Sequence, residues 1–302
     1  MNRITTSERN IIRRLAPVLA TGALVVLAAC GDDSAATDQP TDTAGTIASP
    51  DTSSTVPATT AGGVAGFEHP TGTDDVVVEI IYEGGLVPAD FAFRNLPTLL
   101  VSGGGTQFVL GPQIEIYPGP MLPNVLTSDI GEEGVQTLLE LAADHGLLTH
   151  KEYERNDMVA DAADTVVRVY ANGEVYEHRA YALGMGTSPE SDGTETGDRA
   201  ELQAFVEAAT SQMPMDGTPF APETFLLMAT PIDDAIVADI ELSTTVDWTV
   251  DTVALADAAE CLAVPAADVQ ELFAGSNQAT YFTDGDVTYQ VAAKPQLPGD
   301  SC

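Results

Sequence analysis

Cys30 is the residue whose surroundings indicate a chemistry most directly. It follows Leu27-Ala28-Ala29 at the end of an apolar run that starts at Leu15, and a leader with four arginines and one glutamate precedes that run. This order is typical of a secretory signal peptide. The small side chains of Ala28 and Ala29 leave room for a peptidase at the bond before Cys30, whose thiol we expect to carry a lipid. The alternative is an uncleaved transmembrane anchor, but about 15 apolar residues are few for a membrane span.

The segment 27–30 resembles the lipobox of bacterial lipoproteins. We therefore predict a signal peptide over residues 1–29 and a mature chain that begins at an acylated Cys30, carrying palmitate or a similar acyl group. Two or more acyl chains would hold it stably on the extracytoplasmic face of the cell membrane. The membrane is thus the first expected partner, through the N-terminal lipid.

The predicted mature chain is strongly acidic. The whole sequence has a formal net charge of −35, and removal of residues 1–29 takes away four arginines and one glutamate, which changes the charge to −38. A surface of this sign repels nucleic acid and anionic lipid headgroups, and no basic stretch neutralises it. We expect no nucleic-acid partner, and membrane attachment by lipid alone. The charge also keeps a protein soluble without any specific role.

Two cysteines, Cys261 and Cys302, remain once Cys30 is acylated. In an exported, oxidising setting such a pair predicts one disulfide, which would tie the last residue to a point 41 positions earlier. The alternative is two independent thiols.

Composition divides the chain after the predicted signal peptide into three ranges. Residues 30–66 are mostly Thr, Ser, Ala, Gly, Asp and Pro, which is typical of a disordered linker. Apolar runs and helical periodicity begin at about Phe67. Pro and Gly cluster near Met213–Pro222, so we expect an N-terminal subdomain over 67–212 and a C-terminal subdomain over 213–302.

Strand patterns dominate the globular part. Val76–Tyr82 (VVVEIIY) is rich in β-branched residues, which predicts a strand. Three hairpins are expected around turns at 102–106, at Asn172-Gly173 and at Asp284-Gly285, because Asn-Gly and Asp-Gly supply the positive φ of tight turns.

Helical patterns alternate with the hairpins. We expect helices from a cap at Asp129 to Gly146, from a cap at Asp198, over 252–262 with Cys261 inside, and from Pro265 to Gly275. This order predicts an α+β fold, with an antiparallel sheet built from hairpins, helices packed on one face, and one or two subdomains.

Residues for catalysis do not form a recognisable set. The sequence has no G-x-S-x-G and no S-x-x-K pairing of the penicillin-recognising kind, and its four histidines, His69, His145, His150 and His178, lack metal-ligand spacing. We therefore expect no cofactor and favour a protein that is not an enzyme.

Calcium is the one metal for which acidic loops offer candidates. Asp192, Glu195 and Asp198 lie in the glycine-containing segment SDGTETGD. The segment does not fit the twelve-residue loop with a terminal bidentate glutamate. A polar turn followed by a helix cap explains the same residues, so these three are weak candidates.

The string YPGPMLP at 117–123 is the most distinctive internal feature. Its three prolines favour an extended path, along which Tyr117, Pro118, Met121 and Leu122 offer apolar contacts. It is either a rigid connection packed along the domain or an exposed recognition loop.

Five strings together resemble a family of uncharacterised lipoproteins of actinobacteria. They are IIYEGGLVP at 80–88, LPTLLVSGGG at 96–105, YPGPMLP at 117–123, LLELAADHGLL at 138–148 and KPQLPGDSC at 294–302. The resemblance implies a cell-surface location and the 261–302 disulfide, with no activity and no catalytic residue. Relatives tend to have Gly-Asp-Gly where this chain has Gly103-Gly104-Gly105.

The lipid signal, the spacer and the missing catalytic set favour a membrane-tethered extracytoplasmic module that binds an unidentified envelope or extracellular ligand. The alternative is a cell-envelope hydrolase whose carboxylates act without a readable motif. A pocket with converging carboxylates of raised pKa would favour the hydrolase, and an apolar patch or groove would favour the binding module.

Overall fold

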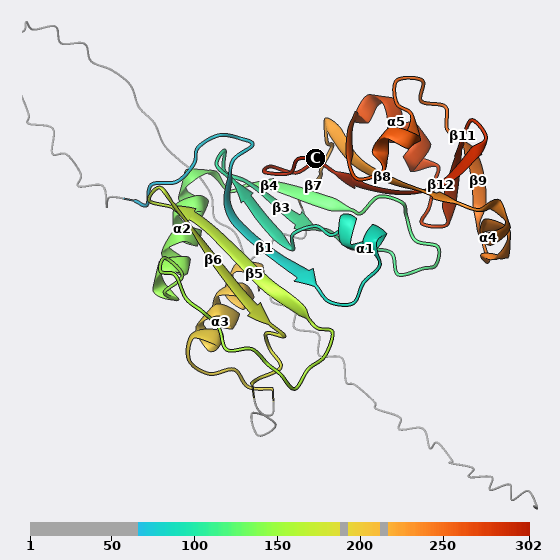
Figure 1. The fold of residues 1–302 in the computed structure, drawn as a ribbon. Coiled ribbons are helices and arrows are strands. Elements are labelled where there is room, and N and C mark those ends of the chain that lie inside the picture. Colours follow the sequence, from blue (N-terminus) through green and yellow to red (C-terminus); the bar gives the residue numbers. More distant parts are fainter. Residues whose placement is uncertain (1–65, 188–192, 212–216) are drawn as a thin grey trace, which may run out of the picture. The chain divides into compact units, whose positions relative to one another are not determined.

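The computed structural model describes residues 66–187, 193–211 and 217–302, which belong to one compact unit. Two β-sheets and five α-helices build this part of the chain (Figure 1). The predicted α+β fold is confirmed. Cys30 and the predicted subdomain boundary at 212/213 lie outside the described residues.

The first sheet has seven antiparallel strands in the order β6-β5-β1-β2-β3-β4-β7. Its strands are β1 (Val76–Gly84), β2 (Leu99–Ser102), β3 (Thr106–Leu110), β4 (Val125–Asp129), β5 (Ala163–Ala171), β6 (Glu174–Tyr181) and β7 (Thr218–Pro219). The chain therefore enters its second sheet only after β7, beyond residue 219.

The second sheet has five strands in the order β10-β8-β12-β11-β9. They are β8 (Thr224–Ile232), β9 (Thr244–Asp247), β10 (Leu262–Pro265), β11 (Thr280–Asp284) and β12 (Val287–Pro295). β9 pairs with β11 in parallel, which departs from the purely antiparallel sheet predicted from hairpin signals. A parallel pair needs a long crossover, and here β10 and a helix lie between the two strands in the sequence.

All three predicted hairpins are confirmed. β2 pairs with β3, β5 with β6 and β11 with β12, each antiparallel. Asn172 and Gly173 have φ of 54° and 77°, and Gly285 has φ of 62°. The turns thus use the positive φ that Asn and Gly adopt most easily.

The helices are α1 (Ala89–Phe93), α2 (Gly131–Asp144), α3 (Gly197–Ser211), α4 (Asp234–Asp239) and α5 (Ala266–Ala274). The N-cap position of α2 is Ile130 rather than Asp129, although the Asp129 carboxylate accepts the N–H of Gly131 at 2.9 Å. Asp198 lies inside the first turn of α3 and its carboxylate accepts from Lys151, so its predicted role as the cap is wrong.

The predicted helix over 252–262 is also wrong. Only Leu255–Ala258 is helical, as one 3-10 turn, and Leu262 already belongs to β10. The N–H of Leu255 donates to the Asp284 carboxylate, and β10 pairs with β8. These long-range contacts override the helix propensity of the alanines, and they leave Cys261 on the segment before β10.

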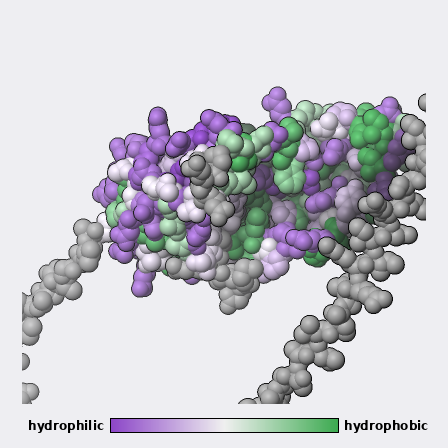
Figure 2. Space-filling view, turned by 90° about the horizontal axis from the view of Figure 1, so that it is seen from below, coloured by the Kyte–Doolittle hydropathy of each residue, from purple (hydrophilic) through white to green (hydrophobic). Residues whose placement is uncertain are grey.

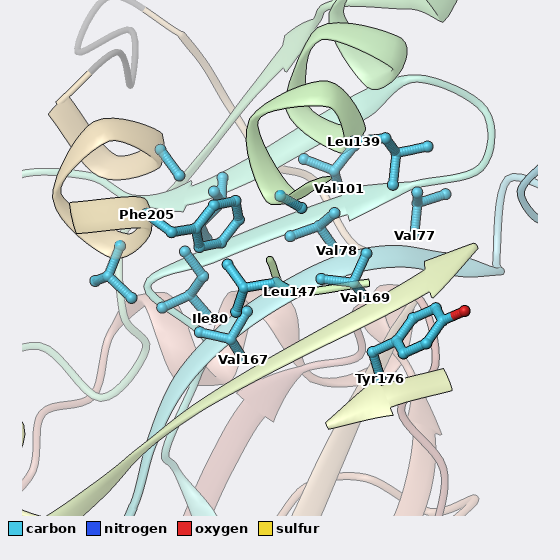
Figure 3. Close-up of a cluster of buried hydrophobic side chains, with 14 of the residues drawn as sticks. Val77, Val78, Ile80, Val101, Leu139, Leu147, Val167, Val169, Tyr176 and Phe205 are labelled. Atoms are coloured by element: carbon cyan, nitrogen blue, oxygen red, sulfur yellow. The ribbon is translucent and has the colours of Figure 1, made fainter. Parts of the chain in front are cut away.

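Two hydrophobic cores hold the elements together. The first lies between one face of the first sheet and the helices α2 and α3, with Ile80, Leu139 and Phe205 fully buried (Figure 3). The second packs Phe273 of α5 and Trp248 against Phe282 and other residues of the second sheet.

A third, smaller cluster covers the opposite face of the first sheet. Leu100 and Phe108 contact Leu297, which lies in the tail after β12, and the ring of Phe220 packs edge-on to Phe108. The tail is held further by the N–H of Gly299, which donates to the carbonyl of Asp74 at 3.0 Å. The C-terminal tail is thus a structural part of the first sheet.

Candidate functional site

The segment 111–124 between β3 and β4, called the proline loop below, contains the YPGPMLP string. Its ends are closed by side chains: the Gln113 amide donates to the carbonyls of Gly111 and Asn124 at 2.8 and 2.9 Å. The N–H of Gly111 also donates to the Asn124 carbonyl at 3.0 Å. The loop therefore starts from a fixed base.

The returning half of the proline loop is fixed to the second sheet. The N–H of Gln278 donates to the carbonyl of Gly119 at 2.9 Å, and Pro120 forms a β-bridge with Asn277. Met121 is 4% exposed and belongs to the second core, against which Leu122 also packs. The tip, with Ile114, Ile116 and Tyr117, remains exposed at 62%, 66% and 67%.

The structure thus separates the four residues predicted as a recognition loop. Tyr117 is exposed, and Pro118 follows it through a cis peptide bond. Met121 and Leu122 instead anchor the loop by packing. The string is a rigid connection in its second half and an exposed surface at its tip.

The helix α1 lies beside the proline loop and is tied to the second sheet. Arg94 donates to the Asp90 carboxylate at 2.9 Å, one turn earlier, and that carboxylate also accepts from Gln290 of β12 at 3.4 Å. Burial, with smaller contributions from Tyr117 and Asp90, raises the pKa of the nearby Tyr281. Phe91 of α1 is 59% exposed.

An apolar groove of about 350 Å³ lies between α1 and the proline loop. Phe91, Leu96, Leu110, Ile114 and Met121 form most of its apolar lining. Its polar lining residues include Arg94, Gln113 and Gln278. Because α1 and both halves of the loop are hydrogen-bonded in place, the groove is formed before any ligand arrives.

Three exposed apolar side chains, those of Phe91, Leu110 and Ile114, line this groove. Of the fifteen large hydrophobic residues exposed in the described part of the chain, eight lie between Tyr82 and Tyr117. Figure 2 shows one face on which exposed hydrophobic residues gather between hydrophilic areas. Clustered exposure of this kind marks interaction sites, whereas single exposed apolar residues do not.

Phe91, Leu110 and Ile114 were not predicted as site residues. Their signal in the sequence is weak, because they are apolar residues in short, aperiodic stretches that Pro and Gly interrupt. Only the packing of α1 against the loop brings the three together.

The weak calcium candidates do not meet in the described residues. Glu195 binds Arg199 with both carboxylate oxygens, at 2.6 and 2.7 Å, and Asp198 binds Lys151 at 2.8 Å. Burial alone would raise the pKa of Glu195, but Arg199 and the N–H groups of Gly184 and Gly186 outweigh it and lower the pKa. Asp192 lies outside the described residues, within which no three metal-ligating side chains cluster.

A buried histidine occupies the first core. His178 is fully buried; its Nε2–H donates to the carbonyl of Leu147, and its Nδ1 accepts from the hydroxyl of Tyr153, both at 2.8 Å. Burial lowers the pKa of His178, and burial raises that of Tyr153. Both ring nitrogens are used within the fold, so this pair serves to hold the 147–156 segment.

Three carboxyl groups in the part of the chain that the structure describes have a displaced pKa. Burial would raise the pKa of Glu83, but Arg168 and Arg179 bind it at 2.8 and 2.6 Å and lower the pKa instead. The pKa of Glu132 is lowered by hydrogen bonds from Gln136 and His69. The pKa values of Glu83, Glu132 and Glu195 are thus all lowered, whereas a general acid requires a raised pKa.

The two remaining cysteines meet in the structure. Cys261 and Cys302 have their Sγ atoms at bonding distance, 1.97 Å. The bond links the segment before β10 to the C-terminal tail. The prediction that Cys261 lies in a helix is wrong.

Comparisons with known proteins give no match: no family model, no curated protein and no solved structure is significantly similar. Within the described residues, no helix combines the length and the apolar character needed to cross a membrane.

Proposed function

We propose that this protein is a lipoprotein, tethered to the extracytoplasmic face of the membrane through Cys30, that binds a partner in the apolar groove. The tether rests on the sequence of residues 1–30 and the spacer on the composition of residues 30–66. The three exposed apolar side chains that line the groove, those of Phe91, Leu110 and Ile114, are the observation that carries the binding function.

The groove selects the kind of partner. A volume of about 350 Å³ accepts a few apolar side chains and lies at the small end of ligand sites. The net charge of the proposed mature chain, −38, attracts cationic partners and repels anionic ones over distances beyond direct contact. The fitting ligand is therefore a peptide segment or protein surface with apolar side chains and basic flanks.

A small uncharged apolar fluorophore, Nile red, tests the groove before its partner is known. The full chain in detergent below its micelle concentration should enhance the dye fluorescence, and Phe91→Ser and Ile114→Ser should remove most of the enhancement. Val287→Ser is the matched control, because Val287 is 41% exposed in the second sheet.

Equal dye binding by the groove variants and the control would refute the groove as a binding site. If the dye reports the groove, the same variants should lose a basic, apolar peptide selected on the wild-type protein. Retention of that peptide by both variants would place binding elsewhere.

A further inference from the structure

β6 is an edge strand of the first sheet, and alternate residues of it have backbone groups that point away from the sheet. The N–H of Ala182 donates to the carbonyl of Ala163, so the even-numbered residues bond to β5 in this register. In an antiparallel pair the residues between them direct their N–H and C=O outward. These are Val175, Glu177, Arg179 and Tyr181.

The outward groups of β6 are largely free. Within the described residues, the Tyr181 carbonyl is the one that has a partner, the Arg199 guanidinium at 3.2 Å. The side chains of Glu177 and Arg179 are 46% and 39% exposed. Three consecutive outward residues, from Val175 to Arg179, are thus open to another strand.

A row of alternating charges crosses the sheet and ends at this edge. Glu79 of β1 lies directly opposite Arg168 of β5, which lies directly opposite Glu177 of β6. Arg168 binds both carboxylates, at 2.5 and 2.9 Å. A strand added beside β6 would continue the row best with a cation opposite Glu177, since directly opposed charges of unlike sign stabilise a sheet.

We propose that β6 pairs with β6 of a second copy of this chain, antiparallel and centred on His178. This register sets Glu177 opposite the partner's Arg179, and Arg179 opposite the partner's Glu177. The two sheets would then join through the outward backbone groups, and each charged row would gain one further member, the partner's Arg179.

The charges select this register among the neighbouring ones. Pairing through the outward groups requires odd-numbered residues to face odd-numbered residues. A strand pair centred on Glu177 would place two glutamates face to face, and one centred on Arg179 would place two arginines face to face. Like charges directly opposite each other destabilise a sheet, so the register centred on His178 is favoured.

Reversing the charge at Glu177 or at Arg179 tests the proposal, because a mixture of the two variants should restore the pairing that each variant alone loses. Sedimentation velocity of the full chain in non-ionic detergent, with micelles in excess and about 0.15 M salt to screen the repulsion between two acidic chains, should show a dimer that grows with concentration. Glu177→Arg and Arg179→Glu should each lower the association constant about tenfold or more, because both symmetric pairs become repulsive. A one-to-one mixture of the two variants should dimerise like wild type, since each supplies the charge that the other lacks.

Glu271→Arg is the control, an equal charge change at an exposed position of α5, and it should leave the dimer intact. The mixture also separates the proposal from a folding defect, because misfolded variants would not rescue one another. A wild-type chain that stays monomeric, single variants that dimerise normally, or a mixture that stays monomeric would each overturn the pairing.

Discussion

Arg199 of α3 and Glu195, four residues earlier and just before the helix, form a buried ion pair, with Nε of Arg199 at 2.6 Å from Oε2 and Nη2 at 2.7 Å from Oε1. Their side chains are 5% and 2% exposed. Arg199 also donates to the carbonyls of Glu154, Tyr181 and Ala182, and Glu195 accepts from two backbone N–H groups. The pair thus joins three segments of the chain around α3.

Removing one partner should destabilise the fold strongly. Arg199→Leu leaves the Glu195 carboxylate buried without its cation, and breaking a buried pair in this way costs about 3–5 kcal/mol. Denaturant unfolding measures the change. Arg155→Ala is the control: Arg155 is 65% exposed, lies 3.6 Å from Asp157 and stacks on the Tyr181 ring at 4.0 Å, so its loss should cost only about 1 kcal/mol. Equal losses from both variants would contradict the prediction.

His178 should make stability depend on pH. Burial lowers its pKa in the fold, while the unfolded chain protonates this ring near its usual value of about 6.5. The contribution to the free energy of unfolding is therefore complete above about pH 6.5 and decreases as the pH falls below it, with a slope of at most about 1.4 kcal/mol per pH unit.

Unfolding at pH 7.5 and 5.5 measures this loss, and His178→Gln should remove most of the difference between the two values. His150→Gln is the matched control, since His150 is exposed and makes only the smallest of the contributions to the pKa of His178. A His178→Gln protein with the same pH dependence as wild type would show that other groups cause it.

The Cys261–Cys302 bond should be structural. Cys302→Ser should lower the free energy of unfolding by up to about 4 kcal/mol, the loop-entropy value for a separation of 41 residues. Leu297 and the hydrogen bond of Gly299 still hold the tail, so the variant should fold. Thiol labelling of the wild-type protein without reductant checks the bond, and labelled Cys261 or Cys302 would refute it.

Cys30 should carry the lipid. Mass spectrometry of the protein from its native host should find an acylated Cys30 as the first residue, and Cys30→Ala should release the chain from the membrane or leave the leader uncut. A cleaved, unmodified chain that still fractionates with the membrane would contradict the tether.

Local chemistry in the sequence determined the hairpins and most of the helices. Asn172-Gly173 favours a tight turn that reverses the direction of the chain, because these two residues adopt positive φ at low cost. The apolar stripe of α3, from Leu202 to Ala209, needs one buried face wherever the helix lies. Such signals act within a few residues, so they can be interpreted without knowledge of the rest of the chain.

Long-range packing decided what the sequence left open. In the segment predicted as a helix over 252–262, the N–H of Leu255 instead donates to Asp284, and β10 pairs with β8. β9 pairs with β11 in parallel, and Glu195 binds Arg199 rather than calcium. The candidate groove also depends on long-range packing, because Met121 and Leu122 pack in the second core while the side chains of Phe91 and Ile114 stay exposed. Whether an apolar side chain is buried or offered to a partner depends on contacts between residues far apart in the chain, which composition and periodicity do not record.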